Sequence, residues 1–209
     1  MVRAVEKALE APCFALRRSV SLAGLVACRS KMRDEGQLVP SINDYLLRAA
    51  GLALREHPVV NASFLDGKVI QYSRVNVGVA IAVPGGLVAP AVYDVDLKDA
   101  AHVGHDVRQL VERAQNRSLN LEVLRDATLT VSNLGMFGIE DFDPLVNLPQ
   151  AAILGVGAVD KGSTKSMRLS LVCDHRVLTG VEGAMYLQTL CDLLEDVEDT
   201  SRVLWKEGT

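Results

Sequence analysis

The 209-residue chain lacks any apolar run near the roughly 18 to 20 residues that a membrane-spanning helix needs. Its N-terminal segment, residues 1–6, lacks the basic start and apolar core of a signal peptide. It also lacks the Ser- and Arg-rich, acid-poor character of a transit peptide. No block of basic residues is present, and the formal net charge is only −4. The sequence therefore predicts neither a membrane segment nor a nucleic-acid partner.

Closely paired cysteines are missing as well. Cys13, Cys28, Cys173 and Cys191 are widely spaced, whereas a zinc site or a disulfide framework needs pairs such as Cys-x-x-Cys. We therefore expect no metal site, and free thiols in a reducing, intracellular compartment. Cys173 lies two positions before His175, which suggests a nucleophile, but its place in an alternating apolar strand favours a packed core thiol.

The chain does contain enough apolar sequence for one sizeable core, with 49% hydrophobic and 23% charged residues. We expect a single domain over residues 1–209. Helical and alternating patterns follow one another without a strict β-α-β order, which predicts an α/β sandwich with a mixed sheet. The predicted helices cover residues 2–10, 23–33, 42–56 (with Ser41 as N-cap), 99–116 and 180–197. The predicted strands cover residues 13–22, 69–72, 75–83 (buried on both faces), 87–93, 127–132, 151–158 and 169–173.

The most informative stretch is Asp174-His175-Arg176-Val177-Leu178-Thr179-Gly180, which directly follows the last predicted strand. An imidazole at the end of a buried strand, between an acid and a base, can take a proton from a thiol or hydroxyl near neutral pH. A histidine that only satisfies hydrogen bonds at a strand end would give the same sequence. This motif alone leaves both interpretations open.

Two further segments give the motif its context: Thr130-Val131-Ser132-Asn133-Leu134-Gly135-Met136-Phe137-Gly138-Ile139 and Asn147-Leu148-Pro149-Gln150-Ala151-Ala152-Ile153-Leu154-Gly155-Val156-Gly157. With Asp174-His175-Arg176, they closely resemble the catalytic domain of the dihydrolipoamide acyltransferases, the core subunits of 2-oxo acid dehydrogenase complexes. Residues 41–47, 57–62 and 86–90 follow the family's order and spacing, so the resemblance covers nearly the whole chain. It implies the two-layer sandwich fold of chloramphenicol acetyltransferase. The lipoyl and subunit-binding domains of full-length members are absent from the sequence, so we expect the catalytic core alone.

The resemblance also implies a reaction, the transfer of an acyl group between the thiols of dihydrolipoamide and coenzyme A. Both compounds would be substrates. His175 matches the family's general base, and Ser132 matches its donor to the oxyanion. Without the family pattern, Ser132 would be interpreted as a turn serine that bonds its own backbone. Asp174, Arg176, Asn133 and Gly135 are expected to support the site, and the glycines at 135, 138 and 155 suit either close backbone approach or tight turns.

One position departs from the family pattern. The residue before Gly180 is usually an aspartate, which can pair with an arginine of the first helix, and Arg3 stands where that arginine belongs. This chain has Thr179 instead, which carries no charge. We expect a less well aligned site with the same mechanism, because His175 and Ser132 are retained.

In the family, the active site lies between neighbouring subunits of a trimer, with the histidine and the serine contributed by different chains. C-terminal apolar residues join such trimers into hollow cubes or dodecahedra. Val203-Leu204-Trp205 is an apolar cluster suited to that role, and the alternative is that Trp205 packs on its own domain. The implied partners are further copies of this chain, the lipoyl domain, and the pyruvate dehydrogenase and dihydrolipoamide dehydrogenase components.

The transferred acyl group and the cellular compartment are predicted from short segments that resemble particular members of the family. Gly183-Ala184 and residues 132–139 resemble the acetyl-transferring members, while succinyl and branched-chain transfer stay open. Residues 2–14 and the missing acid at Thr179 resemble some plastid and cyanobacterial members. They favour the plastid stroma over the mitochondrial matrix or the bacterial cytoplasm. Two other functions remain as alternatives: a non-catalytic core paralog, which usually loses the histidine, and a free-standing acetyltransferase for small hydroxylated compounds.

Overall fold

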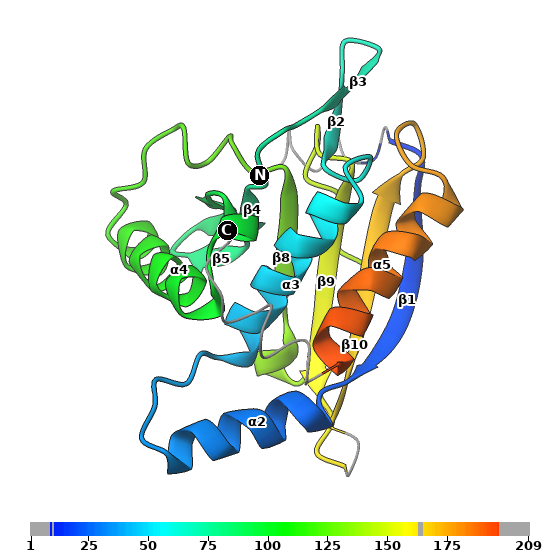
Figure 1. The fold of residues 1–209 in the computed structure, drawn as a ribbon. Coiled ribbons are helices and arrows are strands. Elements are labelled where there is room, and N and C mark those ends of the chain that lie inside the picture. Colours follow the sequence, from blue (N-terminus) through cyan, green and yellow to red (C-terminus); the bar gives the residue numbers. More distant parts are fainter. Residues whose placement is uncertain (1–8, 10, 163–164, 197–209) are drawn as a thin grey trace.

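The computed structural model describes residues 9, 11–162 and 165–196. One six-stranded sheet forms its centre (Figure 1). In spatial order its strands are β1 (Cys13–Ser21), β10 (Ser166–Asp174), β9 (Ala152–Val159), β8 (Leu129–Asn133), β4 (Val77–Val79) and β7 (Ala91–Val92). Neighbouring strands are antiparallel except at the β9–β8 and β8–β4 pairs, which are parallel. The sheet is therefore mixed, as the sequence predicted.

Two helices cover one face of this sheet. They are α3 (Ile42–Glu56) and α5 (Gly180–Glu195), which lie against each other across the strands (Figure 1). The helix α4 (Ala100–Gln115) packs beside α3, and α2 (Ala23–Asp34) contacts α5. The main core lies between these helices and the central strands, so β9 and β10 are buried along most of their length.

The start of α3 shows how local sequence fixes an element. The hydroxyl of Ser41 accepts a hydrogen bond from the backbone N–H of Asp44, and the Asp44 carboxylate accepts one from the N–H of Ser41. This reciprocal capping box satisfies two N–H groups that have no partner within the helix. The predicted N-cap at Ser41 is confirmed.

An extended segment, residues 139–148, lies against β9 on the sheet. The segment can lie this close because Gly155 has no side chain: a Cβ at this position would lie only 2.9 Å from Cδ of Pro144. A small second core, made of Val146, Ile153 and Val172, forms where this segment meets the sheet. The segment directly continues the loop after β8, so its packing also fixes where that loop leaves the sheet.

The structure corrects two predicted strands. Residues 75–83 form β4 in the main sheet and then a separate strand β5 (Ile81–Val83), which pairs only with β6 (Gly86–Val88). The prediction of one strand buried on both faces was wrong, since Ala82 is exposed. Residues 87–93 likewise divide into β6 and β7 at Pro90, which has no N–H to donate to a strand ladder.

The predicted strand at 69–72 is confirmed as β3 (Lys68–Gln71), but its partner was not predicted. This partner is β2 (Ala62–Leu65), and the hairpin of the two projects beyond one end of the main sheet (Figure 1). Several predicted features lie outside the described residues: the helix over 2–10 apart from residue 9, Arg3, and the apolar cluster at 203–205. The remaining predicted helices and strands agree with the structure to within a few residues.

Candidate active site

His175 is the first residue after β10. Its backbone N–H donates to the carbonyl oxygen of Pro12 at 2.8 Å, and its ring lies 4.8 Å from the Phe14 ring, tilted by 60°. The side chain is exposed, and no described residue forms a hydrogen bond with the imidazole. The alternative of a histidine that satisfies hydrogen bonds at a strand end therefore has no support in this part of the chain. The ring is held by its backbone and by Phe14, and neither ring nitrogen has a hydrogen-bond partner among the described residues.

The neighbours of His175 in sequence serve the turn. The fully buried carboxylate of Asp174 accepts hydrogen bonds from the backbone N–H of Arg176 at 2.9 Å and from its guanidinium at 2.6 Å. The guanidinium also lies over the Phe64 ring, 4.5 Å from its centre. A buried carboxylate is stable as an anion only when it is paired in this way. Asp174 and Arg176 thus fix the turn beside His175.

Ser132 lies near the end of β8, where it pairs with Gly155 of β9. It is half-buried, and no described residue accepts a hydrogen bond from its hydroxyl. A turn serine would bond its own backbone, so the structure favours the interpretation of a free donor.

The loop after Ser132 is held tightly. The Asn133 side chain accepts from the N–H of Gly135 at 2.8 Å and donates to the side chain of Asn43 on α3 at 3.2 Å. A Cβ on Gly135 would lie 2.6 Å from the carbonyl oxygen of Gly157. Close backbone approach explains this glycine, whereas Gly138, with φ of +78°, serves a turn.

Gly135→Ala is expected to lower the thermal stability, because the added methyl meets backbone that cannot easily move. Overpacking of this kind costs about 1–3 kcal/mol of unfolding free energy. Gly86→Ala is the matched control, since its Cβ would meet nothing within 4 Å. Equal melting temperatures for the two variants in a thermal scan would contradict the close approach.

The two proposed groups do not meet within one chain. Ser132 pairs with Gly155, Gly155 pairs with Ser170, and His175 lies five residues beyond Ser170 along β10. Five residues of strand span about 16 Å, and two strand spacings add roughly 10 Å sideways. The strands β8 and β10 run in opposite directions, and Ser132 aligns with the middle of β10, whereas His175 follows the last residue of that strand. Groups so far apart cannot act on the same bond.

Cys173 can be removed from the list of candidate nucleophiles. Its side chain is fully buried between the sheet and α5, and burial raises the pKa of its thiol to about 12. It stays protonated near neutral pH, so the prediction of a packed core thiol is confirmed. All four cysteines are free, and Cys13 is exposed.

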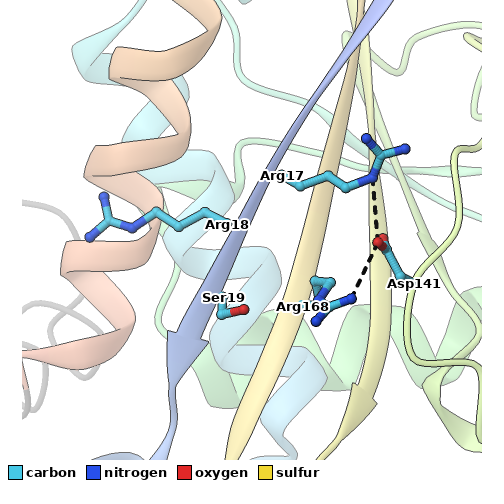
Figure 2. A pocket seen from close by; sticks show the side chains of 5 residues that line it. All are labelled: Arg17, Arg18, Ser19, Asp141 and Arg168. Atoms are coloured by element: carbon cyan, nitrogen blue, oxygen red, sulfur yellow. Dashed lines mark ion pairs between the residues drawn. The ribbon is translucent and has the colours of Figure 1, made fainter.

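Figure 2 shows a charged hollow on the sheet that sequence reasoning did not find. It has a volume of about 260 Å³ and is lined by Arg17, Arg18, Ser19, Asp141 and Arg168. The Asp141 carboxylate pairs with Arg17 at 3.4 Å and with Arg168 at 3.7 Å (Figure 2). Arg17 also pairs with Asp143. These ion pairs fasten the 139–148 segment to β1 and β10. The third arginine of the lining, Arg18, pairs with Asp192 of α5 at 3.0 Å.

Within the described ranges, no group of three or more histidine, cysteine or acidic side chains is arranged to hold a metal ion. No helix there is both long and apolar enough to cross a membrane.

The family model described as 2-oxoacid dehydrogenases acyltransferase (catalytic domain) matches residues 1–201. The chain belongs to this family. The mitochondrial dihydrolipoyllysine-residue acetyltransferase component of the pyruvate dehydrogenase complex of Dictyostelium discoideum is 34% identical over 206 residues, which are 93% of this chain and 32% of that protein. The chloroplastic component 5 of Arabidopsis thaliana is 34% identical over 208 residues, 94% of this chain and 44% of that protein. The chain thus spans less than half the length of these relatives.

Solved structures agree with the family. The Azotobacter vinelandii dihydrolipoamide acetyltransferase superposes with a TM-score of 0.86 at 28% identity, covering 97% of this chain and 88% of that chain. The cubic core of a pyruvate dehydrogenase multienzyme complex gives 0.86 at 29% identity, with the same coverage. Chloramphenicol acetyltransferase gives 0.61 at 14% identity over 93% of this chain and 94% of its own, which shows the shared fold. The predicted fold class is confirmed.

The Azotobacter structure comes from a study of one serine, one histidine and one asparagine in that enzyme's catalytic mechanism, and its asparagine lies four positions after its histidine. In this chain, the position four residues after His175 is Thr179. Thr179 is the N-cap of α5, and it shares a capping box with Glu182. This capping role was not predicted, although Thr-x-x-Glu before an apolar run is a known capping signal.

Proposed function

We propose that this acyltransferase domain moves an acetyl group between dihydrolipoamide and coenzyme A, in a site shared by two copies of the chain. The observation that carries the proposal is the placement of His175 and Ser132. Neither side chain has a hydrogen-bond partner among the described residues, and the register of the sheet separates them by five strand residues and two strand spacings. A neighbouring chain that brings its serine to this chain's histidine would complete the site.

The reaction then needs only these two groups and the substrates. The imidazole of His175 takes the proton of the attacking thiol, and the thiolate adds to the thioester carbonyl carbon. The hydroxyl of Ser132 donates a hydrogen bond to the oxygen that becomes negative. When the tetrahedral intermediate collapses, the carbon–sulfur bond to the other thiol breaks, and the departing thiolate takes the proton back from the imidazolium. A neutral hydroxyl suits the donor's role because it does not protonate the attacking thiolate.

A competition assay tests this function against its two alternatives. Dihydrolipoamide and chloramphenicol would be offered together as acceptors for acetyl-coenzyme A. Acetylation of dihydrolipoamide alone supports the proposal, and acetylation of chloramphenicol supports a small-molecule acetyltransferase. No product from either acceptor supports a non-catalytic core paralog. Succinyl- and isobutyryl-coenzyme A, offered in separate runs, would establish the acyl preference.

We further propose that the chain forms trimers that assemble into a larger hollow core. The likeness to the cubic core structure supports assembly, and the split site supports the trimer. The working partners would be a lipoyl domain and the pyruvate dehydrogenase and dihydrolipoamide dehydrogenase components. Related proteins occur in mitochondria, chloroplasts and a bacterium, and among these compartments we favour the plastid stroma.

Light scattering is expected to give a mass of three chains or a multiple of three. Deleting residues 203–209 should reduce a larger particle to trimers, if the apolar cluster at 203–205 joins them. Large particles that survive the deletion would exclude the tail as the joint. A monomeric native protein would contradict the shared site.

A further inference from the structure

The turn that carries His175 is fixed at both ends. At its start, the carbonyl oxygen of Asp174 accepts the N–H groups of Val177 and Leu178, both at 3.0 Å. At its far side, the first turn of α5 packs directly on the sheet at Gly183, whose Cβ would lie 2.9 Å from Cδ1 of Leu16. Both anchors belong to buried parts of the fold. The residue that joins the turn to the helix, Thr179, is exposed. Its carbonyl oxygen accepts the N–H of Gly183 at 3.2 Å, and its own N–H and hydroxyl are bonded by a side chain.

That joining residue, Thr179, is held by one carboxylate. Oε2 of Glu182 accepts a hydrogen bond from the backbone N–H of Thr179 and another from its hydroxyl, both at 2.8 Å. The same hydroxyl accepts from the N–H of Glu182 at 3.4 Å. Because Thr179 donates these bonds, the pKa of the Glu182 carboxyl lies below its usual range. The carboxylate is therefore charged and in place near neutral pH.

We propose that Glu182 is a positioning residue for His175: it closes the catalytic turn by fixing the backbone and hydroxyl of Thr179. This inference rests on the proposed function, because it assumes that His175 is the base. The asparagine named in the study of the Azotobacter catalytic mechanism lies four positions after its histidine, the same spacing as Thr179 from His175. In this chain the carboxylate that bonds this position comes from Glu182, one helical turn later.

The alternative is a helix cap with no effect on the site, and a second cap in the chain provides the comparison. Asp99 caps α4, where its side chain accepts from the N–H of His102 at 2.8 Å. That cap follows a 3-10 turn, η1 (Val95–Leu97), in which no residue is proposed for catalysis. Asp99→Ala removes the N-cap acceptor of α4, and Glu182→Ala removes the N3 acceptor of the α5 capping box, so each variant frees donors at the start of one helix. Only the cap of α5 is joined directly to the turn of His175.

The kinetic test compares Glu182→Ala, Glu182→Gln and Asp99→Ala with the wild type, well below all melting temperatures. Glu182→Ala should lower kcat by roughly 10- to 100-fold with KM nearly unchanged, because small misplacement of a catalytic group has effects of this size. Glu182→Gln should restore kcat to within about 3-fold of the wild type, since its carbonyl oxygen can accept both bonds from Thr179. Asp99→Ala should keep the wild-type kcat. Three outcomes would each overturn the proposal. Glu182→Ala could keep the wild-type kcat, Glu182→Ala and Asp99→Ala could lose kcat equally, or Glu182→Gln could fail to restore kcat.

A structural readout keeps this test independent of the proposed function. Crystal structures of the assembled wild type and the two Glu182 variants would report the contact between the rings of His175 and Phe14, which are 4.8 Å apart. The imidazole should move by roughly 1 Å or more in Glu182→Ala and stay in place in Glu182→Gln. An unmoved ring in Glu182→Ala refutes the positioning role even if acetyl transfer is found. A wild type without acetyl transfer refutes the proposed function, and the ring position still decides whether Glu182 holds His175.

Discussion

Replacing His175 by alanine is expected to lower the rate of acetyl transfer from acetyl-coenzyme A to dihydrolipoamide by roughly 100- to 10,000-fold. General acid–base catalysis contributes an effect of this size, and the imidazole is the group proposed to take the thiol's proton. The fold should be unchanged, because the side chain is exposed and its ring contacts only Phe14 among the described aromatic residues. The measurement is initial rate against substrate concentration, with circular dichroism and light scattering to establish that the protein is intact.

The other three histidines of the chain provide controls. His57 ends α3, where its Nε2 lies 2.8 Å from the hydroxyl of Thr189, and His102 and His105 are on α4. His105→Ala is the best matched of these, because this ring is also exposed and is bonded only to Gln109, at 2.9 Å, among the described residues. It should keep wild-type turnover. Wild-type turnover in His175→Ala would contradict the assignment of His175 as the general base.

Both proposed catalytic residues were predictable from the sequence because each lies within a local motif beside a strongly patterned strand. The apolar runs that became β9 and β10 have the continuous burial of central strands, so periodicity located them. Ser41 was predictable as a cap for a related reason, since capping depends on residues three positions apart. Glu182 could have been found by the same rule, because Thr179-x-x-Glu182 precedes the apolar helix α5.

What the sequence did not reveal depends on contacts between distant segments. Phe14 lies against His175 only because β1 pairs with β10 in a particular register. The bond between Asn43 and Asn133 joins residues 90 positions apart, and no local pattern indicates it. The division of residues 75–83 into β4 and β5 has the same cause. An apolar run is compatible with either one buried strand or two short ones, and tertiary packing decides between them.

Ser132→Ala should lower kcat by roughly 100- to 1,000-fold with little change in KM, the usual consequence of losing one donor to an oxyanion. We expect kcat to fall more than KM changes because the hydroxyl has no hydrogen-bond partner among the described residues and is available to the transition state. A raised KM at constant kcat would make Ser132 a binding residue instead. The same variant, combined with His175→Ala, also tests whether two chains share the site.

Coexpressing Ser132→Ala chains with His175→Ala chains is expected to restore activity that neither variant has alone. Each site of a trimer takes its histidine from one chain and its serine from a neighbour. In a random one-to-one mixture, about one site in four therefore receives the intact residue from each side. The restored rate should be about a quarter of the wild-type rate in the random mixture. It should be about a third in trimers purified through a different tag on each variant, because each mixed trimer has one intact site of three. If one chain supplied both residues, every site in the mixture would be defective, and the rate would stay at the level of the separate variants. The register of the sheet predicts restoration, since Ser132 aligns with Ser170, five residues short of His175.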